Sequence, residues 1–88
     1  MILPQRNNKP LNQHSLISLE DWLFNIGACK NEKDPSTWIL SLEDWSAEII
    51  MGQDELKVIW LQGDRSFQRS FPYSFMREDV ERAIIQGP

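Results

Sequence analysis

Residues 67–81 change the spacing of their apolar side chains midway, and this change constrains the fold more than any other feature of the chain. Phe67, Phe71 and Tyr73 lie an even number of residues apart, as the side chains on one face of a strand do. After Ser74 the apolar residues recur at intervals of three and four, which is typical of a helix. The last part of the chain is therefore predicted to be a strand followed by a helix.

Arg69 is the polar residue that shares the parity of these aromatic side chains. An arginine in such a position is expected to bind a carboxylate, stack on a ring, or point out of the sheet toward a partner. In a structural role, its guanidinium group pairs with Glu48 or another strand carboxylate and rests on a ring. In a binding role, it belongs to a polar contact site on the open face of the sheet, made of Arg65, Gln68, Arg69 and Tyr73.

The remaining patterns predict a helix and three more strands. Residues 15–26 show helical spacing, with Ser15 as the expected N-cap and Gly27 as the stop. Short apolar or alternating runs predict strands at residues 37–40, 45–51, 55–61 and 66–73, and the last helix is expected at residues 75–86. The fold class is therefore α+β in the order α-β-β-β-β-α, an antiparallel meander with two helices packed on one face.

The 88 residues are enough for one domain, and a hydrophobic content of 41% with four tryptophans can supply its core. Residues 1–13 contain two prolines, three asparagines and few apolar residues. We expect them to form an extended arm whose removal costs little stability, and residues 14–88 to form a single α+β domain.

The charge balance argues against a nucleic-acid partner. The formal net charge is −4, and acidic residues are interleaved with the arginines of residues 65–82. The α-β-β-β-α part of the predicted order is nevertheless similar to a double-stranded-RNA-binding module, which is a second hypothesis. That module requires a lysine-rich start to its last helix, where this chain has Met76-Arg-Glu-Asp79.

No pattern of reactive residues predicts catalysis. His14 and Cys29 are the only histidine and the only cysteine, and a predicted helix roughly 20 Å long separates them. Adjacent acidic residues point in different directions, and no calcium-binding loop is present. We therefore expect no catalytic residue, no metal site and no cofactor. A small enzyme or ligand-binding domain with a pocket under Trp60 and Tyr73 is a third, generic hypothesis.

The single cysteine excludes an internal disulfide and fits a reducing compartment. The first ten residues lack an extended apolar run, and no later run is long enough to span a membrane. We therefore expect a cytoplasmic protein without membrane insertion.

An apolar patch is predicted on the sheet face that the helices leave open. Ile59 and Leu61 alternate with the predicted core residues of their strand, so they point outward. Trp38 follows a polar turn and is expected at the sheet edge or exposed beside them. An exposed apolar patch of this kind usually marks a protein interface.

Several short motifs together resemble a small cyanobacterial and plastid domain family of unknown function. They are His14, Leu19-Glu-x-Trp22-Leu, Trp38, Trp45-Ser-Ala-Glu48, Arg69-Ser-Phe-x-Tyr-Ser74, Asp79-Val-Glu81 and Gly87-Pro88. The resemblance extends from about Pro10 to Pro88. It implies relatives that stand alone or lie beside J-type co-chaperone domains, and hence a binding or assembly role. One departure is Met76, where the family pattern implies a capping serine, so Ser74 is the expected cap here.

The sequence thus favours a non-catalytic protein-interaction factor, of the assembly or chaperone-accessory type, in the cyanobacterial or plastid interior. A protein partner is expected to bind the open sheet face. The predicted contact residues are Trp38, Ile59, Leu61, Arg65, Gln68, Arg69 and Tyr73.

Overall fold

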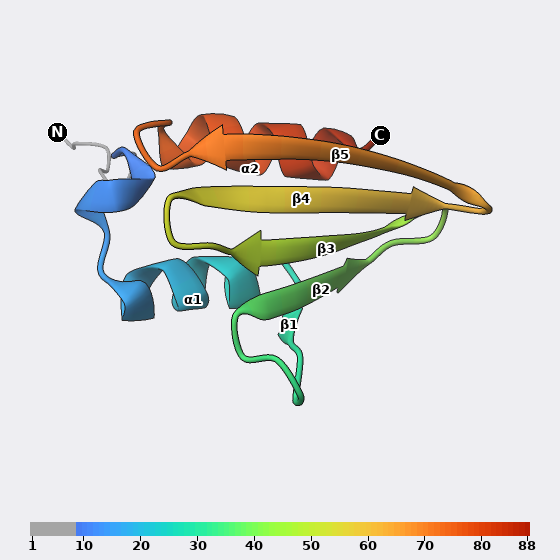
Figure 1. Ribbon diagram of the computed structural model, residues 1–88, viewed down its shortest axis with the longest axis horizontal. Coiled ribbons are helices and arrows are strands. Elements are labelled where there is room, and N and C mark those ends of the chain that lie inside the picture. Colours follow the sequence, from blue (N-terminus) through green and yellow to red (C-terminus); the bar gives the residue numbers. More distant parts are fainter. Residues whose placement is uncertain (1–8) are drawn as a thin grey trace, which may run out of the picture.

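Five antiparallel strands form a sheet whose spatial order follows the chain, β1-β2-β3-β4-β5 (Figure 1). The computed structural model describes residues 9–88. The strands are β1 (Cys29–Lys30), β2 (Thr37–Ser41), β3 (Ser46–Met51), β4 (Glu55–Gln62) and β5 (Arg65–Pro72). The predicted meander is confirmed, with β1 as an additional strand. It was not predicted because a strand of two residues is too short to show an alternating pattern.

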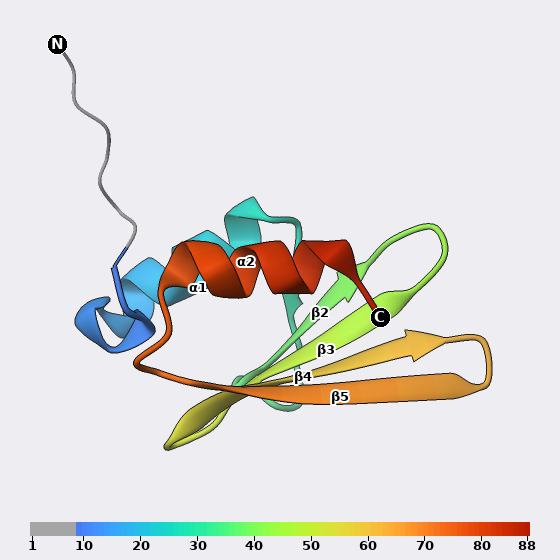
Figure 2. The same ribbon diagram turned by 90° about the horizontal axis from the view of Figure 1, so that it is seen from above.

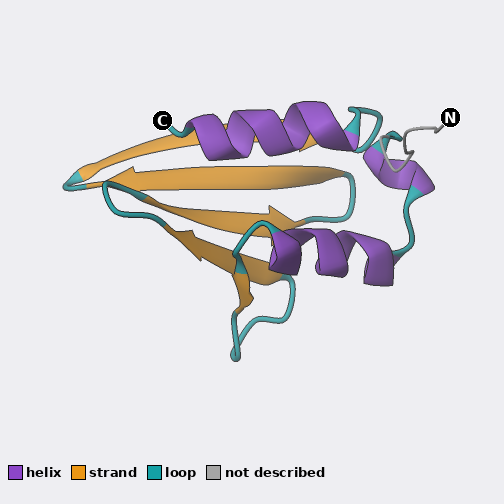
Figure 3. Ribbon diagram, turned by 180° about the vertical axis from the view of Figure 1, so that it is seen from behind, coloured by secondary structure: helices purple, strands orange, loops and turns teal. Residues whose placement is uncertain are grey.

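Both helices lie on one side of the sheet, as Figure 2 shows from above and Figure 3 from behind. They are α1 (Leu16–Asn25) and α2 (Arg77–Gln86), and the predicted α+β class is confirmed. The Oγ of Ser15 accepts a 3.0 Å hydrogen bond from the backbone N–H of Ser18, so the predicted N-cap of α1 is also confirmed. No other described element covers the second face of the sheet.

The start of α2 differs from the prediction. The helix begins at Arg77, and Met76 occupies the N-cap without a side-chain hydrogen bond, so the expectation that Ser74 caps it is wrong. Two carboxylates in the first turn, Glu78 and Asp79, lie near the positive end of the helix dipole. Charge therefore stabilises this end of α2 where a capping side chain is missing.

The core lies between the helices and the facing side of the sheet. The strand residues that alternate inward are buried together with one stripe of each helix, as the spacing predicted. The largest of these core side chains are Leu19, Trp22, Leu23, Trp38, Leu40, Ile49, Leu56, Val58, Trp60, Phe71, Val80 and Ile84. The indole N–H of Trp60 donates a 3.3 Å hydrogen bond to the carbonyl of Ile84, which ties α2 to the middle of β4.

The segment before α1 is part of the folded domain. Leu11–Gln13 forms a 3-10 helix, η1, and the Leu11 side chain is 0% exposed. Backbone hydrogen bonds of 2.9 Å run from Leu11 N–H to the Phe75 carbonyl and from Asn12 N–H to the Tyr73 carbonyl. The prediction of an extended arm is therefore wrong for residues 11–13, and residues 1–8 of that arm lie outside the described residues. That its removal costs little stability stays a prediction.

Candidate interaction surfaces

The predicted contact residues lie on two different faces of the sheet. Paired residues of antiparallel strands share a face, so the register assigns each side chain to a side. Ile59 pairs with Glu48 and Gln68, and Leu61 pairs with Ser46 and Ser66. Ile59, Leu61 and Gln68 therefore lie on the open face, as predicted.

Trp38 lies on the helix-covered face, which corrects the prediction that it is at the sheet edge or exposed. Its partner in the register is the buried Ile49, and Trp38 itself is 5% exposed. The Lys30 ammonium group lies 5.6 Å from the centre of its ring, a cation–π arrangement. Trp38 is therefore a core residue and takes no part in the open face.

Arg69 also lies on the helix side, because it pairs with the buried Val58. Pairing with Glu48 is therefore wrong, since Glu48 points to the opposite face. The expected ring contact is confirmed: the Arg69 guanidinium carbon lies 4.7 Å from the centre of the Phe71 ring. The side chain is exposed nonetheless, because β5 is the edge strand of the sheet.

Arg65 repeats this arrangement four residues earlier in β5. Its guanidinium carbon lies 5.6 Å from the centre of the Phe67 ring, and both residues are exposed. The four polar residues predicted to form one contact site on the open face are thus divided. Gln68 lies on that face, whereas Arg65 and Arg69 point to the other.

Tyr73 has a structural position beyond the end of β5. Its hydroxyl donates a 2.5 Å hydrogen bond to the carbonyl of Gly52 in the β3–β4 turn. Partial burial raises the pKa of the phenol, and the charges of Asp54 and Glu55 raise it further. The contact links that turn to the segment that leads into α2.

The open face carries an apolar strip across the sheet. Ile39 on β2 and Ile59 on β4 flank Glu48 on β3, and Ile50 pairs with Thr37 and Lys57. The isoleucines are half-buried by their neighbours, and Leu61 is exposed. The register thus brings aliphatic side chains from three strands together on a face without helices (Figure 2).

A polar junction between the helices was not predicted. The Trp22 indole N–H donates a 2.7 Å hydrogen bond to Glu81 Oε1, and the Arg77 guanidinium carbon lies 5.9 Å from the centre of the Trp22 ring. These residues line a cleft of about 520 Å³ between α1 and α2. Trp22 and Glu81 are 59 residues apart, so no local pattern could have indicated the contact.

The outer ridge of α1 was also missed. Ile17 is 70% exposed and Phe24 is 68% exposed, on the side of the helix opposite its buried stripe. Their spacing of seven residues is a signal that the sequence does contain. The helix is therefore apolar on two sides.

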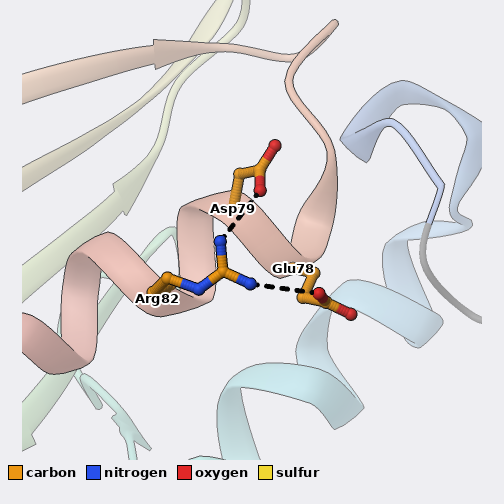
Figure 4. Close-up of polar contacts among 3 residues, drawn as sticks. All are labelled: Glu78, Asp79 and Arg82. Atoms are coloured by element: carbon orange, nitrogen blue, oxygen red, sulfur yellow. Dashed lines mark hydrogen bonds and ion pairs between the residues drawn. The ribbon is translucent and has the colours of Figure 1, made fainter.

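The exposed side of α2 carries two carboxylates and one arginine. Arg82 donates a 3.2 Å hydrogen bond from Nη2 to Glu78 Oε1 and a 3.4 Å bond from Nη1 to Asp79 Oδ1 (Figure 4). Both are exposed ion pairs. This helix therefore offers a phosphate backbone little net positive charge.

Within residues 9–88, no three His, Cys, Asp or Glu side chains lie close enough together to hold a metal ion. No helix of these residues is long and apolar enough to cross a membrane.

The sequence matches a known domain family. The model of the family described as "Protein of unknown function (DUF3143)" matches residues 26–87, which run from the end of α1 to the end of α2. Searches of curated proteins and of solved structures found no match. The chain therefore belongs to this uncharacterised domain family.

Proposed function

We propose that the protein is a non-catalytic interaction module that binds a protein partner through the open face of its sheet. Its role would be that of an assembly or chaperone-accessory factor in the reducing interior of a cyanobacterial cell or plastid. The family match assigns no activity, so the proposal depends on the geometry of the sheet.

The observation that carries the proposal is the aliphatic strip of Ile39, Ile50, Ile59 and Leu61 on a face without helices. An antiparallel sheet with one solvated face normally carries polar side chains there. An apolar surface with polar groups among and beside its side chains is typical of a protein interface. Glu48 lies within this strip, between Ile39 and Ile59, and Lys57 and Gln68 lie beside it.

The test is affinity purification with two matched variants. In extracts of the source organism, the unmodified protein should capture a partner that the Ile59→Lys/Leu61→Lys variant loses. The control is Ile17→Lys/Phe24→Lys, which places the same two charges on distant, exposed apolar residues of α1. Circular dichroism should show that all three proteins remain folded. Equal capture by the open-face variant, or no specific capture by the unmodified protein, would contradict the proposal.

A further inference from the structure

Among residues 9–88, no strand lies beside the outer edge of β5. β5 pairs with β4 along all eight of its residues, and the neighbouring backbone pairing, between Pro10 and Met76, lies beyond its end. The described residues provide no other backbone hydrogen bond to residues 66–70. An edge of this kind can accept an additional strand.

The turn before β5 determines which backbone groups point outward. Gly63 and Asp64 form a two-residue loop with a φ of 62° at Gly63, so Gln62 and Arg65 are the hydrogen-bonded pair that closes it. Hydrogen-bonded and non-hydrogen-bonded pairs then alternate along the hairpin. The backbone N–H and C=O groups of Ser66, Gln68 and Ser70 therefore point away from β4.

Pro72 supports this assignment. Proline lacks an N–H, so in a strand it is confined to positions whose nitrogen faces away from the ladder. Pro72 has the same parity as Ser66, Gln68 and Ser70. The sequence thus contains a proline at a position where an outward-facing nitrogen is expected.

Two arginines flank this edge without a carboxylate partner. Arg65 and Arg69 lie on the helix side of β5, four residues apart, and neither forms an ion pair with any residue of the described part of the chain. Each rests on a ring two residues further along the strand. Their guanidinium N–H donors are therefore available to a carboxylate from outside.

We propose that the β5 edge binds an extended acidic segment of a protein partner by strand addition. The backbone of this segment would pair with Ser66, Gln68 and Ser70, and two of its carboxylates, four residues apart, would reach Arg65 and Arg69. Such a segment supplies hydrogen-bond partners for the unpaired backbone groups of the edge. It also supplies a carboxylate for each of the two arginines. The proposal does not depend on the open face, which is a different surface of the sheet.

A second copy of this chain is the competing occupant, and charge disfavours it. Pairing β5 with β5 of another copy would place the arginines of both strands on the same side of the joined sheet. No carboxylate of either strand would lie between them, because β5 contains no acidic residue. Such like-charged edges are a common device against self-association.

The probe is the capped synthetic peptide Thr-Glu-Thr-Val-Thr-Glu-Thr, in which the glutamates oppose Arg69 and Arg65 when the strands are antiparallel. A second peptide has glutamine in place of both glutamates. Fluorescence anisotropy should show that the glutamate peptide binds at least about tenfold more tightly, because each carboxylate gains charge-assisted hydrogen bonds. Equal affinity of the two peptides would overturn the proposal.

Two protein variants and a matched control locate the site. Arg69→Gln should weaken binding of the glutamate peptide about tenfold, whereas Lys33→Gln, the same charge change on an exposed loop residue, should not alter it. Gln68→Pro removes an outward N–H without removing a bond to β4, so it should abolish binding. Unchanged binding by Gln68→Pro would overturn the proposal.

If Gln68→Pro fails to fold, a modified peptide decides the question with the unmodified protein. N-methylation of the peptide nitrogens that face β5 should abolish binding, and methylation of the alternate nitrogens should not. Sedimentation of the protein alone tests the competing occupant, because a dimer that Gln68→Lys dissociates would show the edge to be occupied by a second copy and overturn the proposal. Ile59→Lys should leave peptide binding intact, so failure of the open-face proposal would be seen separately.

Discussion

The indole Nε1 of Trp22 and the carboxylate of Glu81 are joined by a 2.7 Å hydrogen bond that connects α1 to α2. Trp22 is buried, so its N–H has little access to water, and Glu81 is half-buried beside it. A buried donor that loses its partner keeps its full cost of desolvation. This bond therefore contributes to the fixed position of the two helices on the sheet.

We expect Glu81→Ala to lower the free energy of unfolding by about 1–3 kcal/mol, because it leaves the Trp22 N–H unpaired. Glu81→Gln is the matched control, since its amide oxygen can still accept the hydrogen bond, and it should cost clearly less. Urea denaturation followed by tryptophan fluorescence would measure both. Equal losses in the two variants would show that the hydrogen bond is not the cause.

Leu11 provides a second test, because it is fully buried although it precedes both helices. Leu11→Ala should lower the free energy of unfolding by about 2–5 kcal/mol, the usual cost of a large cavity in a core. The control is the exposed neighbour Asn12→Ala, which should cost little. Thermal unfolding of the two variants would show the difference, and similar melting temperatures would mean that the N-terminal segment does not contribute to the core.

The sequence could predict the helices and strands, but it could not predict which other segments pack into the core. The alternating and helical patterns of residues 15–86 correspond closely to the observed strands and helices. Leu11 stands between Pro10 and the polar residues Asn12 and Gln13, so it forms no periodic pattern. Its burial depends on backbone hydrogen bonds to Tyr73 and Phe75, which are more than 60 residues away.

For the predicted contact residues, the limit is how reliably alternation assigns a side chain to one face of the sheet. Alternation correctly placed Ile59 and Leu61 opposite the core residues of β4, because three buried neighbours fix that strand's parity. Thr37–Ser41 is too short for such an assignment, and Trp38 was therefore given the wrong face. For Arg69 the parity was right, but a residue on the core side of an edge strand is not necessarily buried.

Gly87 provides a third prediction. Its φ is 87°, and a β-carbon at this position would lie 2.7 Å from Trp45 Nε1. Gly87→Ala should therefore lower the free energy of unfolding through both backbone strain and a clash with the indole, by roughly 1–3 kcal/mol. Gly63→Ala is the control, because Gly63 also has a positive φ but has open space around its β-carbon position.

The contact with Trp45, together with the ψ of −168° at Gly87, predicts a larger loss of stability for Gly87→Ala than for Gly63→Ala. Differential scanning calorimetry would measure both melting temperatures. A change in the tryptophan fluorescence of folded Gly87→Ala, but not of folded Gly63→Ala, would further connect the loss of stability with the indole. An equal or smaller loss for Gly87→Ala would mean that the end of the chain moves away from Trp45 at little cost.

His14 predicts a specific dependence of stability on pH. Its Nδ1 lies 3.3 Å from Ser18 Oγ. Burial lowers the pKa of the imidazole below its usual 6.5, and the positive charge of Arg77 lowers it further. Protonation thus costs more in the folded protein than in the unfolded chain.

The sign of the effect follows from proton binding. Between the lowered pKa of the folded state and about 6.5, the unfolded chain binds more protons, so the free energy of unfolding falls as the pH falls through this range. His14→Gln cannot titrate, and its stability should therefore decrease less than that of the unmodified protein between pH 7.5 and pH 5. Urea denaturation of both proteins at the two pH values isolates the contribution of His14, because their other titratable groups are the same. Equal decreases would show that protonation of His14 is not coupled to unfolding.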